Sequence, residues 1–164
     1  MRSLTKISNF VDKIAGYFVA IIFSLMIFAC VMQVYTRFIL NDSLSWTEEL
    51  ARYTFIWSTM LAASICVKRS SHATVTLLLD FSPPFLKRFL SMIIHIIICY
   101  VAVIMTIYGT QMMIGTSEQL SPSLRMSMGI LYLSLPVSGI CILIHSFDKM
   151  LPLLFAKNPF GEKM

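Results

Sequence analysis

The chain has 164 residues, of which 57% are hydrophobic and 13% are charged, and its formal net charge is +5. A soluble domain carries about 25% charged residues, so this sequence lacks the charge that a water-facing surface needs. The composition excludes an ordinary globular enzyme, a disordered chain, a fibrous protein and a small secreted domain held by disulfides. It predicts an all-α integral membrane protein that forms a single membrane domain over residues 1–164.

The first predicted membrane span covers residues 14–36, which carry no charge. A helix needs about 20 apolar residues to cross a hydrocarbon core of about 30 Å, and this stretch is long enough. The basic segment before it resembles the start of a signal peptide. However, bulky Phe28 stands where a cleavage site before Cys30 requires a small residue, so we expect an uncleaved helix.

The second predicted span covers residues 46–67, and its first turns are charged. Ser45 and Glu48 have the spacing of a capping box, which places the start of the helix near Trp46. Glu48 and Arg52 are four residues apart, in the order that favours an ion pair.

The charged end of this span has two interpretations. It is either a capped helix end with a tryptophan anchor at the membrane surface, or a surface covered by a partner protein. The partner is favoured because the uncharged part of the helix is shorter than the membrane core, so the charged turns need cover. The residues of this candidate surface are Trp46, Glu48, Glu49, Arg52 and Trp57.

The third and fourth spans are predicted over residues 84–114 and 126–147, and Pro136 is a candidate kink in the last one. The loop between the second and third spans, residues 68–88, contains a weakly amphipathic stretch that allows an interfacial helix. Four spans place both termini on the same side of the membrane.

The distribution of basic residues predicts which side that is. Ten of the 13 lysines and arginines fall at the termini and in the 68–88 loop. Basic residues concentrate on the cytoplasmic side of membrane proteins, so we expect cytoplasmic termini in a bacterial inner membrane. The net positive charge therefore indicates topology and contact with anionic lipids, and it gives no reason to expect nucleic-acid binding.

The spans contain little that could perform chemistry. Their uncharged parts carry serine, threonine and glutamine, which more often pack helices together than form a transport path. The cysteines lie one per span, whereas a quinone-coupled disulfide-forming enzyme needs redox cysteines in its outer loops. The chain alone is therefore predicted to be neither an enzyme nor a complete transporter, and a free-standing small transporter remains the weakest alternative.

Two histidines keep a second alternative open. His95 and His145 are both predicted near the cytoplasmic ends of their spans. Two such histidines on antiparallel helices can hold a b-type haem, although His145 would lie almost at the lipid headgroups. The alternative function is therefore a haem- or quinone-binding membrane anchor of an oxidoreductase.

Residues 41–52, with Asn41, followed by Trp57, resemble the Asn, Trp-x-Glu-Glu-x-x-x-Arg and Trp pattern of one membrane protein family. This family is the small membrane subunit, or DctQ-like subunit, of tripartite ATP-independent periplasmic (TRAP) transporters. Residues 68–75 resemble its basic, histidine-containing loop, although Thr76 stands where an aspartate often follows. Residues 121–124 and 132–137 resemble its last outer loop and fourth span.

The resemblance implies a non-catalytic scaffold subunit that braces a large multi-span membrane subunit. In this family the large subunit transports an organic anion, such as a dicarboxylate or sialic acid, on a sodium gradient, and a periplasmic substrate-binding protein delivers the anion. We therefore expect no cofactor or metal in this chain, sodium in the large subunit, and lipid around both. The implied partner and scaffold interface is Asn41, Trp46, Glu48, Glu49, Arg52 and Trp57, and the implied cytoplasmic loop contacts are Lys68, Arg69 and His72.

Overall fold

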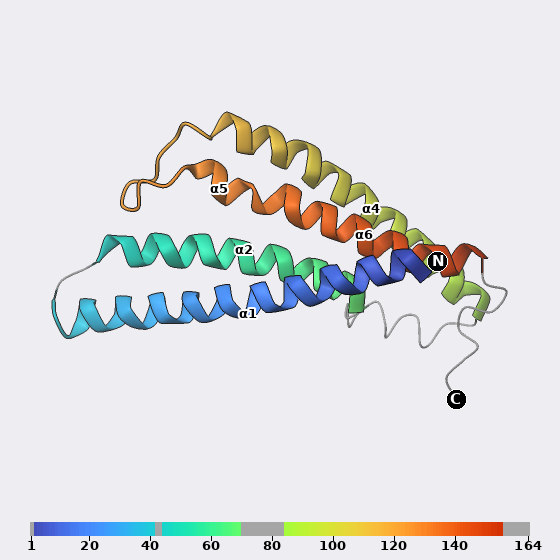
Figure 1. The fold of residues 1–164 in the computed structure, drawn as a ribbon, viewed down its shortest axis with the longest axis horizontal. Coiled ribbons are helices and arrows are strands. Elements are labelled where there is room, and N and C mark those ends of the chain that lie inside the picture. Colours follow the sequence, from blue (N-terminus) through green and yellow to red (C-terminus); the bar gives the residue numbers. More distant parts are fainter. Residues whose placement is uncertain (1, 42–43, 70–83, 156–164) are drawn as a thin grey trace.

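The structure is a computed structural model that describes residues 2–41, 44–69 and 84–155. Four long helices dominate the described part (Figure 1), and none of its residues forms an extended strand. The helices are α1 (Arg2–Phe38), α2 (Ser45–Arg69), α4 (Pro84–Gly115) and α6 (Ser134–Phe155), with a short helix α5 (Met128–Tyr132) before α6.

Four segments are long and apolar enough to cross a membrane, which confirms the predicted all-α fold with four spans. They are Leu4–Phe38, Ser45–Arg69, Phe89–Gly115 and Met128–Leu151. The helix that contains the first span begins well before residue 14, because polar residues of its N-terminal part contact α2 and α6. The predicted interfacial helix lies between residues 69 and 84, outside the described residues.

The four long helices lie side by side in the order α1, α2, α6, α4 (Figure 1). Within the described residues, α4 packs on α6 and α5, and neither α1 nor α2 lies next to it. The arrangement is therefore an open layer rather than a closed four-helix bundle. We call the end that carries residues 116–127 the loop end, and the end where α1 begins and α2 and α6 finish the terminal end.

Small residues set the close approach of α4 and α6. A Cβ atom added to Gly139 would lie 2.5 Å from Thr106 Oγ1 and 3.0 Å from the Ala102 carbonyl oxygen. A Cβ atom added to Gly109 would lie 2.7 Å from Leu135 Cβ. Glycine at these positions lets the two backbones approach, as is usual for helix pairs in membranes.

The last span is interrupted between α5 and α6, close to the predicted kink. Helix α5 ends at Tyr132, Leu133 is its C-cap, and Pro136 follows in the first turn of α6. Proline has no N–H to donate to the carbonyl four residues before it, so a continuous helix through this point would lack that hydrogen bond.

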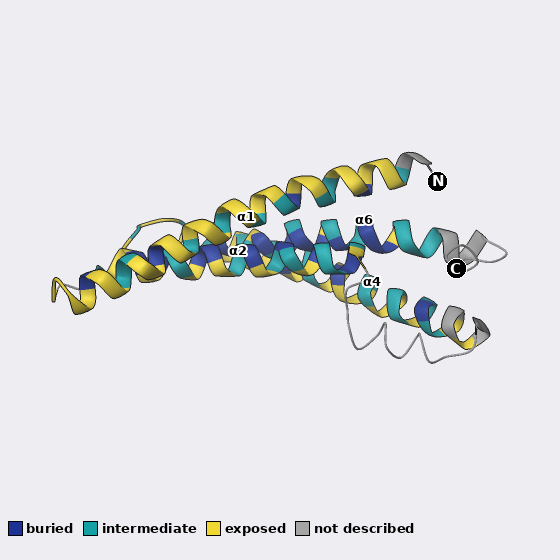
Figure 2. Ribbon diagram, turned by 90° about the horizontal axis from the view of Figure 1, so that it is seen from below, coloured by how far each residue is buried: buried dark blue, intermediate teal, exposed yellow. Residues whose placement is uncertain are grey.

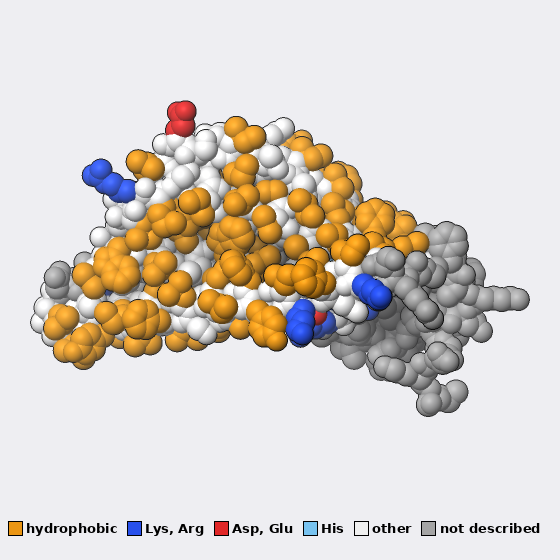
Figure 3. All heavy atoms as spheres, viewed as in Figure 1, with side chains coloured by type: hydrophobic (Ala, Val, Ile, Leu, Met, Phe, Trp, Pro, Cys, Tyr) orange, Lys and Arg blue, Asp and Glu red, His pale blue; other side chains and the backbone are white. Residues whose placement is uncertain are grey.

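The open layer leaves much of the outer helices exposed (Figure 2), and many of these exposed residues are large and apolar. Only 11% of the most apolar window of α1 or α4 is buried, compared with 33% in α2 and 44% in the last span. On the face shown in Figure 3, apolar side chains cover most of the described surface. Such large apolar surfaces require lipid or another protein against them.

Candidate functional site

The candidate partner surface at the loop end divides into an exposed and an internal part. Glu48 and Arg52 form an exposed ion pair, with 3.1 Å between Oε1 and Nη2 and side chains that are 63% and 59% exposed. Trp46, two residues before Glu48 in the first turn of α2, is 37% exposed. An exposed ion pair contributes about 0.2–1 kcal/mol to stability, so this pair is available to a partner at little cost to the fold.

Glu49, the next residue of α2, points about 100° away from Glu48 and is only 7% exposed. Its Oε2 atom accepts hydrogen bonds from the backbone N–H groups of Ser123, at 3.0 Å, and Leu124, at 2.8 Å. Two donors on one carboxylate oxygen make a charge-assisted contact, which is stronger than a neutral hydrogen bond. Glu49 therefore anchors the loop between α4 and α5 onto α2.

This anchored loop has an internal framework of its own. Leu120 and Ser127 form an isolated antiparallel bridge, and the Ser121 N–H donates to the Met126 carbonyl at 2.9 Å. Ser121 is nearly fully buried, and its hydroxyl accepts the Met126 N–H at 3.2 Å. The loop is consequently an ordered element of the loop end, and its conformation includes a positive φ of 50° at Arg125.

Trp57 is an internal contact between separate helices. Its Nε1–H donates to the Ile130 carbonyl of α5 at 3.0 Å, and its ring lies edge-on to Phe18 of α1 with 6.5 Å between the ring centroids. Asn41, by contrast, is exposed just after α1 and has a positive φ of 53°. Asparagine tolerates this left-handed conformation better than most residues do.

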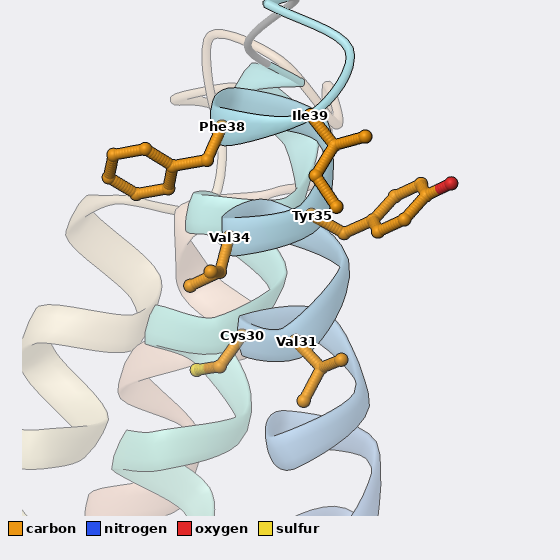
Figure 4. Close-up of a pocket in the computed structure, with 6 residues that line it drawn as sticks. All are labelled: Cys30, Val31, Val34, Tyr35, Phe38 and Ile39. Carbon is orange, nitrogen blue, oxygen red and sulfur yellow. The ribbon is translucent and has the colours of Figure 1, made fainter.

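The hollows of the surface are apolar and shallow. One hollow, of about 550 Å³, runs along the C-terminal part of α1 between Cys30 and Ile39, and five of its six lining residues belong to that helix (Figure 4). A second hollow, of about 300 Å³, lies between α1, α2 and α6 beside Trp57. Ligand sites usually combine an apolar wall with a few converging polar groups, whereas these hollows have the character of contact surfaces for acyl chains or apolar helices.

The predicted cytoplasmic contacts Lys68 and Arg69 are the last residues of α2 and make ion pairs within the chain. Lys68 Nζ lies 2.5 Å from Asp148 Oδ2 on α6, and Arg69 Nη2 lies 3.6 Å from Asp12 Oδ2 on α1. His72 lies outside the described residues. Sequence reasoning missed Asp12 and Asp148 because both are more than 50 positions away from their basic partners.

The two histidines of the alternative reading belong to different contacts. His95 Nδ1 lies 2.8 Å from the Ser91 carbonyl oxygen one turn earlier in α4. His145 Nδ1 lies 2.9 Å from the hydroxyl of Ser8 on α1. Among the described residues, no group of three or more histidine, cysteine, aspartate or glutamate side chains is placed to hold a metal ion.

The family model and the similar proteins that we compared all indicate the same family. A family model described as the DctQ component of tripartite ATP-independent periplasmic transporters matches residues 26–155. A putative TRAP transporter small permease protein of Haemophilus influenzae is 26% identical over 94% of each chain. A sialic acid TRAP transporter small permease protein of Vibrio cholerae is 28% identical over 94% of this chain and 87% of its own length.

A further relative places the matching segment inside a much longer polypeptide. The isethionate TRAP transporter permease protein of Oleidesulfovibrio alaskensis is 33% identical over 57% of this chain, and the match covers 15% of that protein. In this relative, the segment that resembles our chain is therefore joined covalently to a much larger permease sequence.

Proposed function

The chain belongs to the DctQ family of TRAP transporter components, and from this premise we propose that it is the scaffold subunit of a sodium-driven transporter for an organic anion. It is a small permease subunit, an integral membrane protein and a non-catalytic part of the transport machinery that works with a large permease subunit. In our proposal it braces that large subunit and helps to dock a periplasmic substrate-binding protein.

The open helix layer is the observation that supports the bracing role most strongly. A helix pair in a membrane gains stability from packing, and a closed bundle would bury more of α1 and α4 than this layer does. The exposed apolar sides of these two helices fit a larger membrane protein on one side and lipid on the other. The relative that carries the same segment within a long permease is consistent with such a partner.

We propose that the exposed ion pair at the loop end helps to dock the periplasmic substrate-binding protein. Glu48, Arg52 and Trp46 combine opposite charges with an aromatic ring on an ordered helix end, which is a composition common in protein interfaces. The named relatives include sialic acid, C4-dicarboxylate and isethionate transporters, all of which carry organic anions. We therefore assign the whole transporter to this substrate class.

The proposed placement is the bacterial inner membrane with both termini in the cytoplasm. Ten of the 13 basic residues support it by their distribution. A C-terminal fluorescent-protein fusion should be bright, and a C-terminal alkaline phosphatase fusion should be inactive. The opposite pair of results would overturn the orientation and leave the scaffold role to be judged separately.

The docking proposal is tested by Glu48→Ala combined with Arg52→Ala, in the complete transporter. If each side chain contributes about 1 kcal/mol to docking of the substrate-binding protein, the loss of both weakens that association about 30-fold. Uptake then falls while the amount of inserted chain stays constant. Glu118→Ala removes an exposed charge outside this pair and serves as the matched control. Unchanged uptake together with unchanged co-purification of the large subunit and the binding protein would exclude a role for the pair.

A further inference from the structure

A cluster of polar side chains joins three helices at the terminal end. Its members come from one side of the first turns of α1 and from the last turns of α2 and α6. Positions 5, 8 and 12 of α1 lie three and four residues apart, so they share a helix face. The cluster, which we call the polar joint, consists of Thr5, Ser8, Asp12, Lys68, Arg69, His145 and Asp148.

Lys68 is the centre of the polar joint. Its Nζ donates to Ser8 Oγ at 2.7 Å and to Asp148 Oδ2 at 2.5 Å, so one side chain of α2 contacts both α1 and α6. Thr5 Oγ1 donates to the other oxygen of Asp148 at 2.8 Å. The Lys68 and Asp148 side chains are 13% and 8% exposed, so their charges are largely removed from solvent and depend on each other.

Charge is balanced within the polar joint. Lys68 and Asp148 form one pair, and Arg69 and Asp12 form a second, more exposed pair. A fully buried imidazole that stays neutral adds no net charge to this arrangement, and an uncompensated buried charge is costly. His145 has no exposed surface, so a neutral imidazole at this position keeps the charge of the polar joint balanced.

Two buried atoms of the polar joint have no hydrogen-bond partner among the described residues, and no other buried side-chain nitrogen or oxygen there shares this condition. They are His145 Nε2 and Asp12 Oδ1. More than nine-tenths of buried polar groups in proteins have a partner, and ordered water supplies many of these partners. Because both atoms belong to the polar joint, a single ligand bound between them would give each of them a partner.

The contacts of Ser8 indicate which of the two atoms is the donor. Lysine can only donate, so Lys68 uses one lone pair of Ser8 Oγ, and the Ser8 hydroxyl, 2.9 Å from His145 Nδ1, can give its proton to that nitrogen. A neutral imidazole with an accepting Nδ1 carries its proton on Nε2. The unpaired atoms are then complementary, because His145 Nε2–H is a donor and the Asp12 carboxylate oxygen is an acceptor.

We propose that one buried water molecule binds between His145 and Asp12, accepting from Nε2–H and donating to Oδ1. The water completes a continuous chain of hydrogen bonds and ion pairs from Asp148 through Lys68, Ser8 and His145 to Asp12 and Arg69. This site attaches the N-terminal part of α1 to α2 and α6 by polar contacts. It does not depend on which partner or anion the transporter uses.

The test is nitrogen NMR of the full chain, labelled with ¹⁵N-histidine, in lipid nanodiscs at pH 7.5. The chain has three histidines, and His145→Gln identifies the His145 signals by their loss. The expected spectrum shows a neutral ring with an unprotonated Nδ1 and a protonated Nε2. The Nε2 proton should also show magnetisation transfer from a bound water.

Three variants make the assignment specific. Asp12→Leu removes the acceptor and should abolish the transfer from water, whereas Asp12→Asn retains an oxygen and should keep it. Asn9→Ala changes an exposed neighbour of Ser8 and should leave the His145 signals unaltered. A wild-type ring protonated on Nδ1 alone or on both nitrogens would overturn the proposal, and this result needs no variant to fold. Transfer from water that persists in Asp12→Leu would overturn it as well.

Discussion

Glu48 and Glu49 are neighbours in sequence but act on different sides of α2. Consecutive residues of a helix point about 100° apart, because the helix has 3.6 residues per turn. Glu48 therefore pairs with Arg52 at the surface, while Glu49 binds two backbone N–H groups of the loop between α4 and α5. One residue contributes to a candidate interface, and the other positions the loop beside it.

Replacing Glu49 with alanine should loosen this loop. The variant leaves the Ser123 and Leu124 N–H groups without their acceptor, and hydrogen bonds to a charged group contribute about 1.5–3 kcal/mol. We expect a lower thermal unfolding temperature of the detergent-solubilised chain and faster hydrogen exchange at these two amides. Glu48→Ala is the control and should change the free energy of unfolding by less than about 1 kcal/mol. Equal effects of the two variants would contradict the division of roles.

The motif that contains these residues was visible in the sequence, but the two roles were not. The i, i+4 spacing predicted the Glu48–Arg52 contact, because that contact is local. The Glu49 acceptor role depends on a loop that lies 74 positions away, and no local spacing encodes it. The inward position of Trp57 was equally hidden, since its partner carbonyl belongs to Ile130.

At the scale of elements, glycines determine how closely α4 and α6 pack. Gly139→Ala places a Cβ atom 2.5 Å from Thr106 Oγ1 and 3.0 Å from a backbone carbonyl oxygen. Overpacking of this kind costs about 1–3 kcal/mol, so we expect a lower unfolding temperature. Gly16→Ala in α1 is the matched control, because a Cβ atom there meets nothing within 4 Å, and alanine is the better helix former. An equally stable Gly139→Ala would show that the two helices are not tightly packed.

The ion pair of the polar joint should behave as a coupled unit. Lys68→Met leaves the Asp148 carboxylate without its cation, and breaking a buried pair costs about 3–5 kcal/mol. The double variant Lys68→Met with Asp148→Leu removes both charges and should be less destabilised than Lys68→Met alone. Thermal unfolding of four chains, namely the wild type, Lys68→Met, Asp148→Leu and the double variant, measures this coupling. Additive effects of the two substitutions would mean that the pair contributes no coupling energy.

The existence of the helices was predictable, whereas their contacts were only partly so. Charge-free stretches and the membrane thickness predicted four spans, since both constraints act on local sequence. The first span was predicted from residue 14, whereas α1 begins at Arg2, and Ser8 and Asp12 in its N-terminal part have partners on α2 and α6. Such tertiary contacts have no periodic signature.

Across the whole described part of the molecule, the long helices form an open layer whose outer members are largely uncovered. The low charge content predicted a membrane protein, and the lack of charge in the middle of the spans predicted a subunit without a transport path of its own. The order α1, α2, α6, α4 could not be predicted, because apolar spans of suitable length do not specify which helices pack against each other. Because α1 and α4 leave large apolar surfaces uncovered, the open layer gives a physical reason to expect a partner protein against them.

In the proposed role, this chain supports transport by the large permease subunit and carries no anion itself. Anion uptake into proteoliposomes tests this role, with the binding protein and a sodium gradient supplied and with the anion that the complete transporter accumulates. We expect uptake only when the large permease subunit and this chain are both present. Uptake by this chain alone, or undiminished uptake by the large subunit without it, would contradict the scaffold role.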